Sequence, residues 1–188
     1  MSRPFSPALV AALAIVLAAT AGEAAAQKKP SAGPYPGRRV GDLAYDFTLK
    51  DLNNNTWSMA AMRGRKVVHL VFWATWCVPC LQEIPILNTA REQFAGEGLE
   101  VLGVVVPINQ QPGLVRAVSR DYKVAYPVLF DSEGDLSGKY KIATIPQNVL
   151  IGKDGIIRYA GTELPPRYDA LVRSLLAEPP PAASSSSR

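Results

Sequence analysis

The stretch from Lys66 to Cys80, KVVHLVFWATWCVPC, places the strongest constraint on what this chain of 188 residues can fold into. Its first nine residues are nearly all aliphatic, β-branched or aromatic, which is typical of a strand buried on both faces of a sheet. The run leads directly into a Trp-Cys-x-x-Cys sequence, and the residues from Cys77 to about Phe94 have the apolar spacing of a helix. We therefore expect a strand, a cysteine pair and a helix in immediate succession.

Cys77 and Cys80 are the only cysteines of the chain. Such a pair could be a redox dithiol, half of a metal site or a short structural disulfide. A hydrophobic content of 48% is enough for a core that needs no covalent bridge. A bridge across so short a loop would also remove little entropy from the unfolded chain, which weakens the structural interpretation.

The predicted helix start favours redox chemistry at the first cysteine. Free backbone N–H groups and the positive end of the helix dipole would face the sulfur of Cys77 and favour its thiolate, which is the nucleophile. Cys80 lies one helical turn further on, so it could attack a mixed disulfide at Cys77 and release the partner. Pro79 removes one N–H from this helix start, which favours a reductant over a strong oxidant.

The N-terminal 26 residues have the pattern of a secretory signal peptide. Arg3 precedes an uncharged apolar run, Ala8 to Ala19, and small residues at Ala24 and Ala26 suit cleavage before residue 27. The run is short for a bilayer span, although an uncleaved anchor is the alternative. Export implies an oxidising, periplasmic or otherwise extracytoplasmic location, where a lone cysteine pair is either bridged or kept reduced on purpose.

The net charge of +4 is carried by a Pro/Gly-rich linker, residues 27–39, which contains four basic residues and no acid. Residues 40–177 are neutral in sum, so a nucleic-acid partner is not expected. The linker is interpreted as a solvated spacer, with contact to anionic lipid as the alternative. Residues 178–188 are of low complexity and are predicted to be disordered.

Between these ends, residues 40–177 read as one α/β domain with a mixed sheet and helices on both faces. The segment 44–60 predicts a hairpin that turns at Asn53–Asn55, and a second hairpin is predicted to turn at Lys153–Gly155. Further strands are predicted within 66–74, 99–108, 125–131 and 146–161, and helices within 58–64, 77–94, 111–122, 136–142 and 166–177.

The sequence FWATWCVPC, followed by LQEIP, resembles the TlpA/ResA-like branch of the thioredoxin superfamily. The resemblance extends from about residue 40 to residue 177 and includes DFTLKDL, YPVLFD, YKIATIPQNVLI and KDGIIRYAG. It implies a thioredoxin-like α/β fold, with a central mixed β-sheet flanked by helices and an N-terminal β-hairpin extension. It also implies an exported thiol–disulfide oxidoreductase without a cofactor or metal.

The resemblance assigns roles to individual residues. Pro146 matches a cis-proline that faces the dithiol, and Ile145 before it would offer backbone groups to an extended substrate. Glu83 matches an acid that could exchange a proton with Cys80. Trp76 would pack beside the dithiol. The expected catalytic residues are Cys77, Cys80 and Glu83, with a redox-active disulfide Cys77–Cys80, and the expected substrate-binding residues are Trp76, Ile145 and Pro146.

Three residues depart from the family pattern. Many relatives have Asn where Val71 stands, and thioredoxin has a buried Asp there, so acid–base chemistry would fall to Glu83 or to water. Gln147 stands where Thr is frequent, which bears on the choice of partner. His69, the only histidine, shares the strand face of Val71 and is interpreted as a core or interface histidine, with a polar role beneath the site as the alternative.

Partners and alternative functions also follow from these residues. The expected partners are protein thiols and disulfides, by resemblance an apocytochrome c cysteine pair, together with an upstream membrane electron donor. A thiol peroxidase of peroxiredoxin type is one alternative, although its Thr-x-x-Cys setting is absent because Thr75 is two residues before Cys77. A copper-binding module is the other, because two thiolates suit soft metals.

Overall fold

The computed structural model describes residues 37–181. The predicted signal segment lies outside these residues, as does most of the predicted linker and tail. Within the described part of the chain, no helix is both long enough and apolar enough to cross a membrane.

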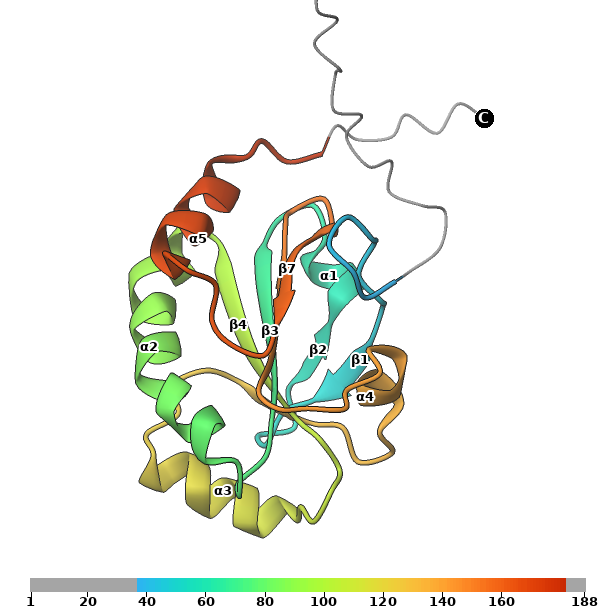
Figure 1. Cartoon of the computed structure of the whole chain (residues 1–188), viewed down its shortest axis with the longest axis vertical. Coiled ribbons are helices and arrows are strands. Elements are labelled where there is room, and N and C mark those ends of the chain that lie inside the picture. The colour runs from blue at the N-terminus through green and yellow to red at the C-terminus, as the bar shows by residue number, and fades with distance from the viewer. Residues whose placement is uncertain (1–36, 182–188) are drawn as a thin grey trace, which may run out of the picture.

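A five-stranded sheet forms the centre of the molecule, with the strand order β5-β4-β3-β6-β7 (Figure 1). Three strands run parallel: β3 (Val67–Trp73), β4 (Leu99–Val105) and β5 (Val128–Phe130). On the other side of β3, β6 (Gln147–Ile151) pairs antiparallel with β3, and β7 (Ile157–Gly161) pairs antiparallel with β6. The predicted mixed sheet is confirmed.

Helices cover both faces of this sheet. Figure 1 shows α2 and α5 on one side and α1 and α4 on the other, with α3 across one end. The helices are α1 (Met59–Met62), α2 (Val78–Phe94), α3 (Pro112–Asp121), α4 (Asp135–Lys139) and α5 (Tyr168–Ala177), and a short 3-10 turn (Ala95–Glu97) follows α2. α2 runs unbroken past Pro85, which stands inside it.

The predicted N-terminal hairpin is also confirmed. β1 (Thr48–Lys50) and β2 (Thr56–Ser58) pair antiparallel as a separate two-stranded sheet. The carboxylate of Asp51 holds the turn between them, because it accepts hydrogen bonds from the backbone N–H of Asn55 at 2.9 Å and from the indole N–H of Trp57 at 3.1 Å.

The core lies around β3, whose seven residues are all buried. Burial on both faces explains why this segment is a continuous apolar run rather than an alternating one. On the neighbouring strand, a side chain at Gly103 would place its Cβ 2.9 Å from the indole nitrogen of Trp73 and 2.9 Å from Tyr126. Glycine at this position therefore lets two aromatic side chains approach the sheet.

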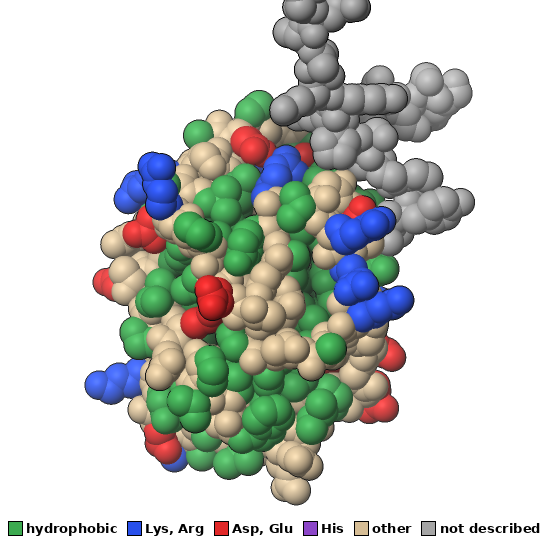
Figure 2. Space-filling model, viewed as in Figure 1, with side chains coloured by type: hydrophobic (Ala, Val, Ile, Leu, Met, Phe, Trp, Pro, Cys, Tyr) green, Lys and Arg blue, Asp and Glu red, His purple; other side chains and the backbone are tan. Residues whose placement is uncertain are grey.

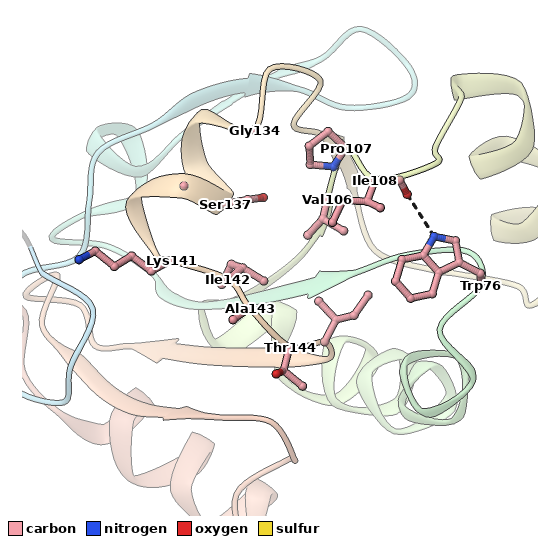
Figure 3. A pocket seen from close by; sticks show the side chains of 12 residues that line it. Trp76, Val106, Pro107, Ile108, Gly134, Ser137, Lys141, Ile142, Ala143 and Thr144 are labelled. Carbon is pink, nitrogen blue, oxygen red and sulfur yellow. Dashed lines mark hydrogen bonds between the residues drawn. The ribbon is translucent and has the colours of Figure 1, made fainter.

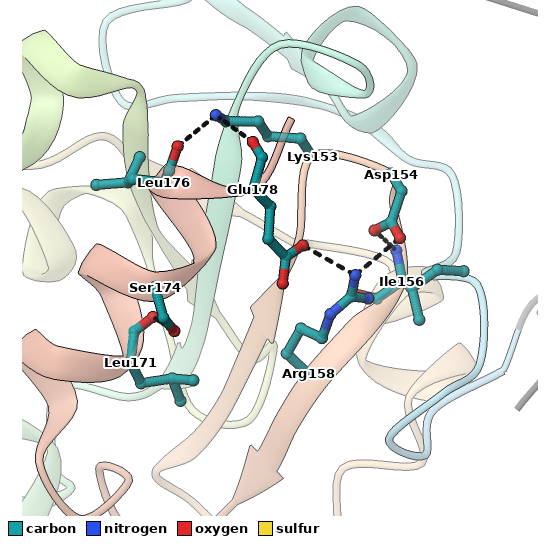
Figure 4. Close-up of polar contacts among 8 residues, drawn as sticks. All are labelled: Lys153, Asp154, Ile156, Arg158, Leu171, Ser174, Leu176 and Glu178. Atoms are coloured by element: carbon teal, nitrogen blue, oxygen red, sulfur yellow. Dashed lines mark hydrogen bonds and ion pairs between the residues drawn. The ribbon is translucent and has the colours of Figure 1, made fainter. Parts of the chain in front are cut away.

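The end of α5 is tied to the hairpin of β6 and β7 (Figure 4). The Nζ of Lys153, in the hairpin turn, donates to the backbone oxygens of Leu176 and Glu178. The guanidinium of Arg158 pairs with Asp154 at 2.8 Å and with Glu178 at 3.1 Å. Glu178, the first residue of the predicted tail, is thus held against the domain.

Candidate active site

The two cysteines form a disulfide bond at the point where β3 gives way to α2. The sulfur atoms of Cys77 and Cys80 are 2.03 Å apart, and their Cα atoms are 5.3 Å apart. Both side chains are buried, each with 4% exposure. Among residues 37–181, no three His, Cys, Asp or Glu side chains gather in a group that could hold a metal ion.

Cys77 is the N-cap of α2 and thus stands at the start of the helix, where the sequence places it. Its Sγ accepts a hydrogen bond of 3.3 Å from the backbone N–H of Cys80, one of the donors that a helix start leaves free. Pro79 stands within the first turn and supplies no such donor. The helix start thus directs a hydrogen-bond donor and partial positive charge toward the sulfur of Cys77.

The peptide bond between Ile145 and Pro146 is cis. In the antiparallel pairing of β3 with β6, Phe72 lies opposite Gln147. Pro146 therefore comes level with Trp73, the last residue of β3, from which the cysteine loop departs. Pro146 is buried and Ile145 is half-buried. The fold thus brings the predicted proline and the dithiol loop to the same edge of the sheet, although they are almost 70 residues apart in the chain.

Trp76 lies at the surface beside this edge. Its side chain is 51% exposed, so it is not a core aromatic. Its indole N–H donates to the backbone oxygen of Ile108 at 3.1 Å (Figure 3). Trp76, Ile108, Ile142 and Ile145 all line a pocket of about 240 Å³. The loop after β4 forms one side of this pocket, and α4 with the loop before β6 forms the other.

Further exposed apolar side chains belong to the first turn of α2, the loop after β4 and α3. Val78, Ile108 and Leu114 are exposed large hydrophobic residues, as Trp76 is, and these four form what we call the apolar rim. Figure 2 shows hydrophobic side chains gathered at this end of the molecule, over α3 and the start of α2, with acidic and basic side chains interspersed at the margins. Exposed apolar surface of this kind is typical of a protein interaction site.

Glu83, one turn after Cys80 on α2, is half-buried. Burial raises the pKa of its carboxyl group, and the nearby charge of Glu163 raises it further. The side-chain amide of Asn148 and the backbone of Leu164 oppose this effect. The Nδ2 of Asn148 lies 3.2 Å and 3.1 Å from the two carboxylate oxygens.

Reasoning from the sequence missed Asn148, which stands on β6 directly opposite Val71 on β3. Opposed residues of antiparallel strands share a face, so the amide that Val71 cannot supply comes from the neighbouring strand. His69 is a fully buried core histidine, as predicted, and it contacts both Asn148 and Tyr168. The only sequence signal for Asn148 was its place as a polar residue in the otherwise largely apolar strand QNVLI.

Comparison with known proteins places these residues in a family context. Residues 40–160 match the model of the AhpC/TSA family. The chain is 31% identical over 122 residues to the thioredoxin-like protein YneN of Bacillus subtilis, covering 65% of this chain and 71% of YneN. It is 32% identical over 120 residues to the thiol-disulfide oxidoreductase ResA of Geobacillus kaustophilus, covering 63% of this chain and 67% of ResA.

Solved structures show the same similarity. A crystal structure assigned as a thiol:disulfide interchange protein DsbE from Chlorobium tepidum superposes with a TM-score of 0.64 at 27% identity, covering 74% of this chain and 96% of that one. The similarity thus spans most of the described domain.

Proposed function

The chain belongs to the AhpC/TSA family of thioredoxin-like proteins, and we propose that it is a thiol–disulfide oxidoreductase that exchanges disulfides with other proteins through Cys77 and Cys80. The single observation that carries this proposal is the bridged pair at the first turn of α2, with Cys77 as the N-cap. The oxidoreductase names of the relatives agree with it.

The bridge is the oxidised product of a two-step exchange. In the reduced protein, the Cys77 thiolate attacks one sulfur of a substrate disulfide, the substrate S–S bond breaks, and the freed substrate thiolate takes up a proton. Cys80 then loses its proton and attacks the Sγ of Cys77. This forms the intramolecular bridge and releases the second substrate thiolate. Two electrons pass from the dithiol to the substrate.

Glu83 is proposed as the proton partner of Cys80 in the second step. It stands one helical turn beyond Cys80, and burial raises the pKa of its carboxyl group. An acid whose pKa moves toward the working pH exchanges protons more effectively than one that remains fully ionised. This role requires Glu83 only for release of the substrate and not for the first attack by Cys77.

The apolar rim and the pocket beside it are proposed to receive the substrate protein. Trp76 and Ile145 line the pocket, and the buried Pro146 follows at the edge of the sheet. An extended substrate segment could pair with the backbone before β6 while its apolar side chains enter the pocket. Docking by backbone and apolar contacts suits partners that present a disulfide on an exposed, extended segment.

Trapping of mixed disulfides tests the proposal. The Cys80→Ser variant keeps the attacking sulfur and lacks the resolving one, so it should accumulate covalent complexes with protein substrates. Cys77→Ser is the matched control, because it has the same number of thiols, and it should trap none. Non-reducing gels and mass spectrometry detect the complexes. Their absence from both variants would refute the mechanism.

We further propose that the protein acts outside the cytoplasm as a reductant. The signal-like pattern of residues 1–26, Pro79 in the first turn of α2 and the ResA and DsbE relatives support this. An apocytochrome c cysteine pair is the proposed substrate, and a membrane-bound thiol donor would restore the dithiol. Identification of the proteins trapped on Cys80→Ser in intact cells tests both partners, and recovery of cytoplasmic proteins alone would contradict the location.

A further inference from the structure

A chain of hydrogen bonds extends from Glu83 through the sheet to α5. The Nδ2 of Asn148 reaches both carboxylate oxygens of Glu83, and its Oδ1 lies 3.0 Å from the Nε2 of His69. The Nδ1 of His69 lies 2.7 Å from the hydroxyl of Tyr168. Asn148 and His69 each have 0% exposure. In this series of hydrogen bonds, the amide nitrogen and oxygen of Asn148 and both ring nitrogens of His69 each have a partner.

When Glu83 is ionised, only one assignment of hydrogen-bond donors and acceptors fits all of these contacts. A carboxylate only accepts, so the NH₂ group of Asn148 must face Glu83 and its oxygen must face His69. That oxygen only accepts, so the Nε2 of His69 must carry the proton. Burial lowers the pKa of His69 to about 4, so the ring is neutral and its Nδ1 accepts from the hydroxyl of Tyr168.

We propose that Asn148 is a positioning residue for Glu83, and that His69, held by Tyr168, supports the Asn148 amide from the side away from the carboxylate. The inference rests on the proposed role of Glu83 as the proton partner of Cys80. In this arrangement the ionised carboxylate sets the direction, because the hydroxyl of Tyr168 can donate or accept and follows the ring that it meets. His69 donates from Nε2 to the amide oxygen of Asn148, which keeps the two N–H donors of Asn148 on the carboxylate and holds Glu83 in one orientation on its helix.

Few other groups around Glu83 stabilise its ionised carboxylate, so the amide of Asn148 contributes much of what does. Glu163, in the loop after β7, repels the ionised carboxylate, and only the backbone of Leu164 adds a further favourable contact. The charge of Glu83 also raises the pKa of the phenol groups of Tyr126, Tyr159 and Tyr168, so these three groups lie within its electrostatic reach. None of these groups is cationic. Asn148 therefore supplies the one side-chain hydrogen bond that offsets the burial of Glu83.

Nuclear magnetic resonance can test which atoms donate in these hydrogen bonds, without any activity measurement. His69 is the only histidine, so the ¹⁵N imidazole signals of tag-free protein report on it alone. Between pH 5 and pH 8 we expect one neutral tautomer with the proton on Nε2. Glu83→Gln replaces the acceptor-only carboxylate by a group that can donate or accept, and it should populate the other tautomer as well. A wild-type ring that carries its proton on Nδ1, or that titrates near its ordinary pKa of 6.5, would overturn the proposal.

Rapid-mixing kinetics test the effect on Glu83. Reduced Asn148→Leu protein is mixed with a fluorescent peptide that contains a disulfide, and attack and release are measured separately. Attack, followed in the Cys80→Ser background, should stay within about twofold, whereas release should slow about tenfold because the carboxylate loses its orientation. The pH midpoint of release should move upward, since a contact that favours the ionised form is lost. An unchanged rate and pH profile of release would overturn the proposal.

Two comparisons separate positioning from a structural effect. In the Glu83→Gln background, Asn148→Leu should slow release no further, because its effect passes through the carboxylate. Additive losses would instead overturn the proposal. Asn88→Leu is the matched control, since Asn88 on α2 bonds to the backbone at Lys123 and Ala125, and it should leave the pH profile unchanged. A pH midpoint that moved equally in this control would also count against positioning.

These outcomes distinguish the two proposals. If Cys80→Ser forms mixed disulfides but the rate and pH profile of release are unchanged by Asn148→Leu, only the positioning role fails. If Cys80→Ser forms none, the proposed function itself fails. Should Asn148→Leu not fold, the tautomer measured in the wild-type and Glu83→Gln proteins still decides the direction of these hydrogen bonds.

Discussion

The backbone N–H of Cys80 donates a hydrogen bond of 3.3 Å to the Sγ of Cys77. The contact exists because Cys77 is the N-cap of α2, so its sulfur takes the place of the oxygen that usually caps a helix. In the reduced protein the same N–H would face a free sulfur. The two cysteines of one motif therefore differ in their surroundings, and we expect them to differ in acidity.

The reduced Cys77 thiol should have a pKa below the value of about 8.5 found for free cysteine. The helix start favours the thiolate, since it supplies both a hydrogen-bond donor and the positive end of the dipole. The pH dependence of alkylation by iodoacetamide in Cys80→Ser measures this pKa, and Cys77→Ser gives that of the other thiol. A Cys77 that titrates like free cysteine would contradict the expected activation.

Replacement of Glu83 by Gln should stabilise the protein increasingly as the pH rises. Burial raises the folded-state pKa of Glu83 above the ordinary value of 4.5. Below that value the carboxyl group is protonated in both states, and as the pH rises through the folded-state pKa its ionisation costs stability. Glu83→Gln avoids this loss. Urea unfolding of the oxidised wild-type and Glu83→Gln proteins between pH 4 and pH 8 measures the difference in their free energies of unfolding. A difference that does not change with pH would contradict the prediction.

His69 should make the protein sensitive to acid. Burial lowers its pKa from 6.5 to about 4. Between these two pH values the imidazole is protonated in the unfolded chain and neutral in the folded protein. The associated stability, roughly 3 kcal/mol, is present above pH 6.5 and is lost as the pH falls toward 4. The pH dependence of urea unfolding should therefore weaken in His69→Gln over this interval. An identical slope in both proteins would show that His69 does not cause it.

Trp76→Ala should impair the reduction of protein substrates and leave stability nearly intact. The side chain is 51% exposed, so its removal should change the free energy of unfolding by about 0.5 kcal/mol or less. Reduction of a small disulfide such as glutathione disulfide should continue at the normal rate, because it does not need the apolar rim. Trp76→Phe, which keeps an aromatic ring, is the matched control. An equal loss on small and protein substrates would argue against a docking role.

Much of the fold could be predicted because its signals are local. The continuous apolar run of β3 indicates a strand buried on both faces, and all seven of its residues are buried. The apolar spacing from Cys77 to about Phe94 predicts α2, and the observed helix, Val78–Phe94, begins one residue later with Cys77 as its N-cap. The hairpin turn at Lys153–Gly155 was visible in its glycine and charged residues. In each case neighbouring residues carry the whole signal.

The candidate site was predictable where a motif covers it and not elsewhere. The cysteine pair stands in one turn of sequence, and its bridge needs only local geometry. The cis bond before Pro146 came from family resemblance, not from the residues themselves. Asn148 resembles any polar residue of a strand, and nothing near it in the chain indicates a contact with Glu83.

The amino-acid sequence by itself determined the order of strand, dithiol and helix, because hydrophobic periodicity and helix capping act over a few residues. Only the tertiary structure decided that Glu83, Asn148, His69 and Tyr168 meet. These contacts join residues 65, 79 and 99 positions apart, and they depend on the register of β3 with β6 and on where α5 packs. Register and packing are set by burial of the whole core, and that burial places an amide beneath the helix that carries the dithiol.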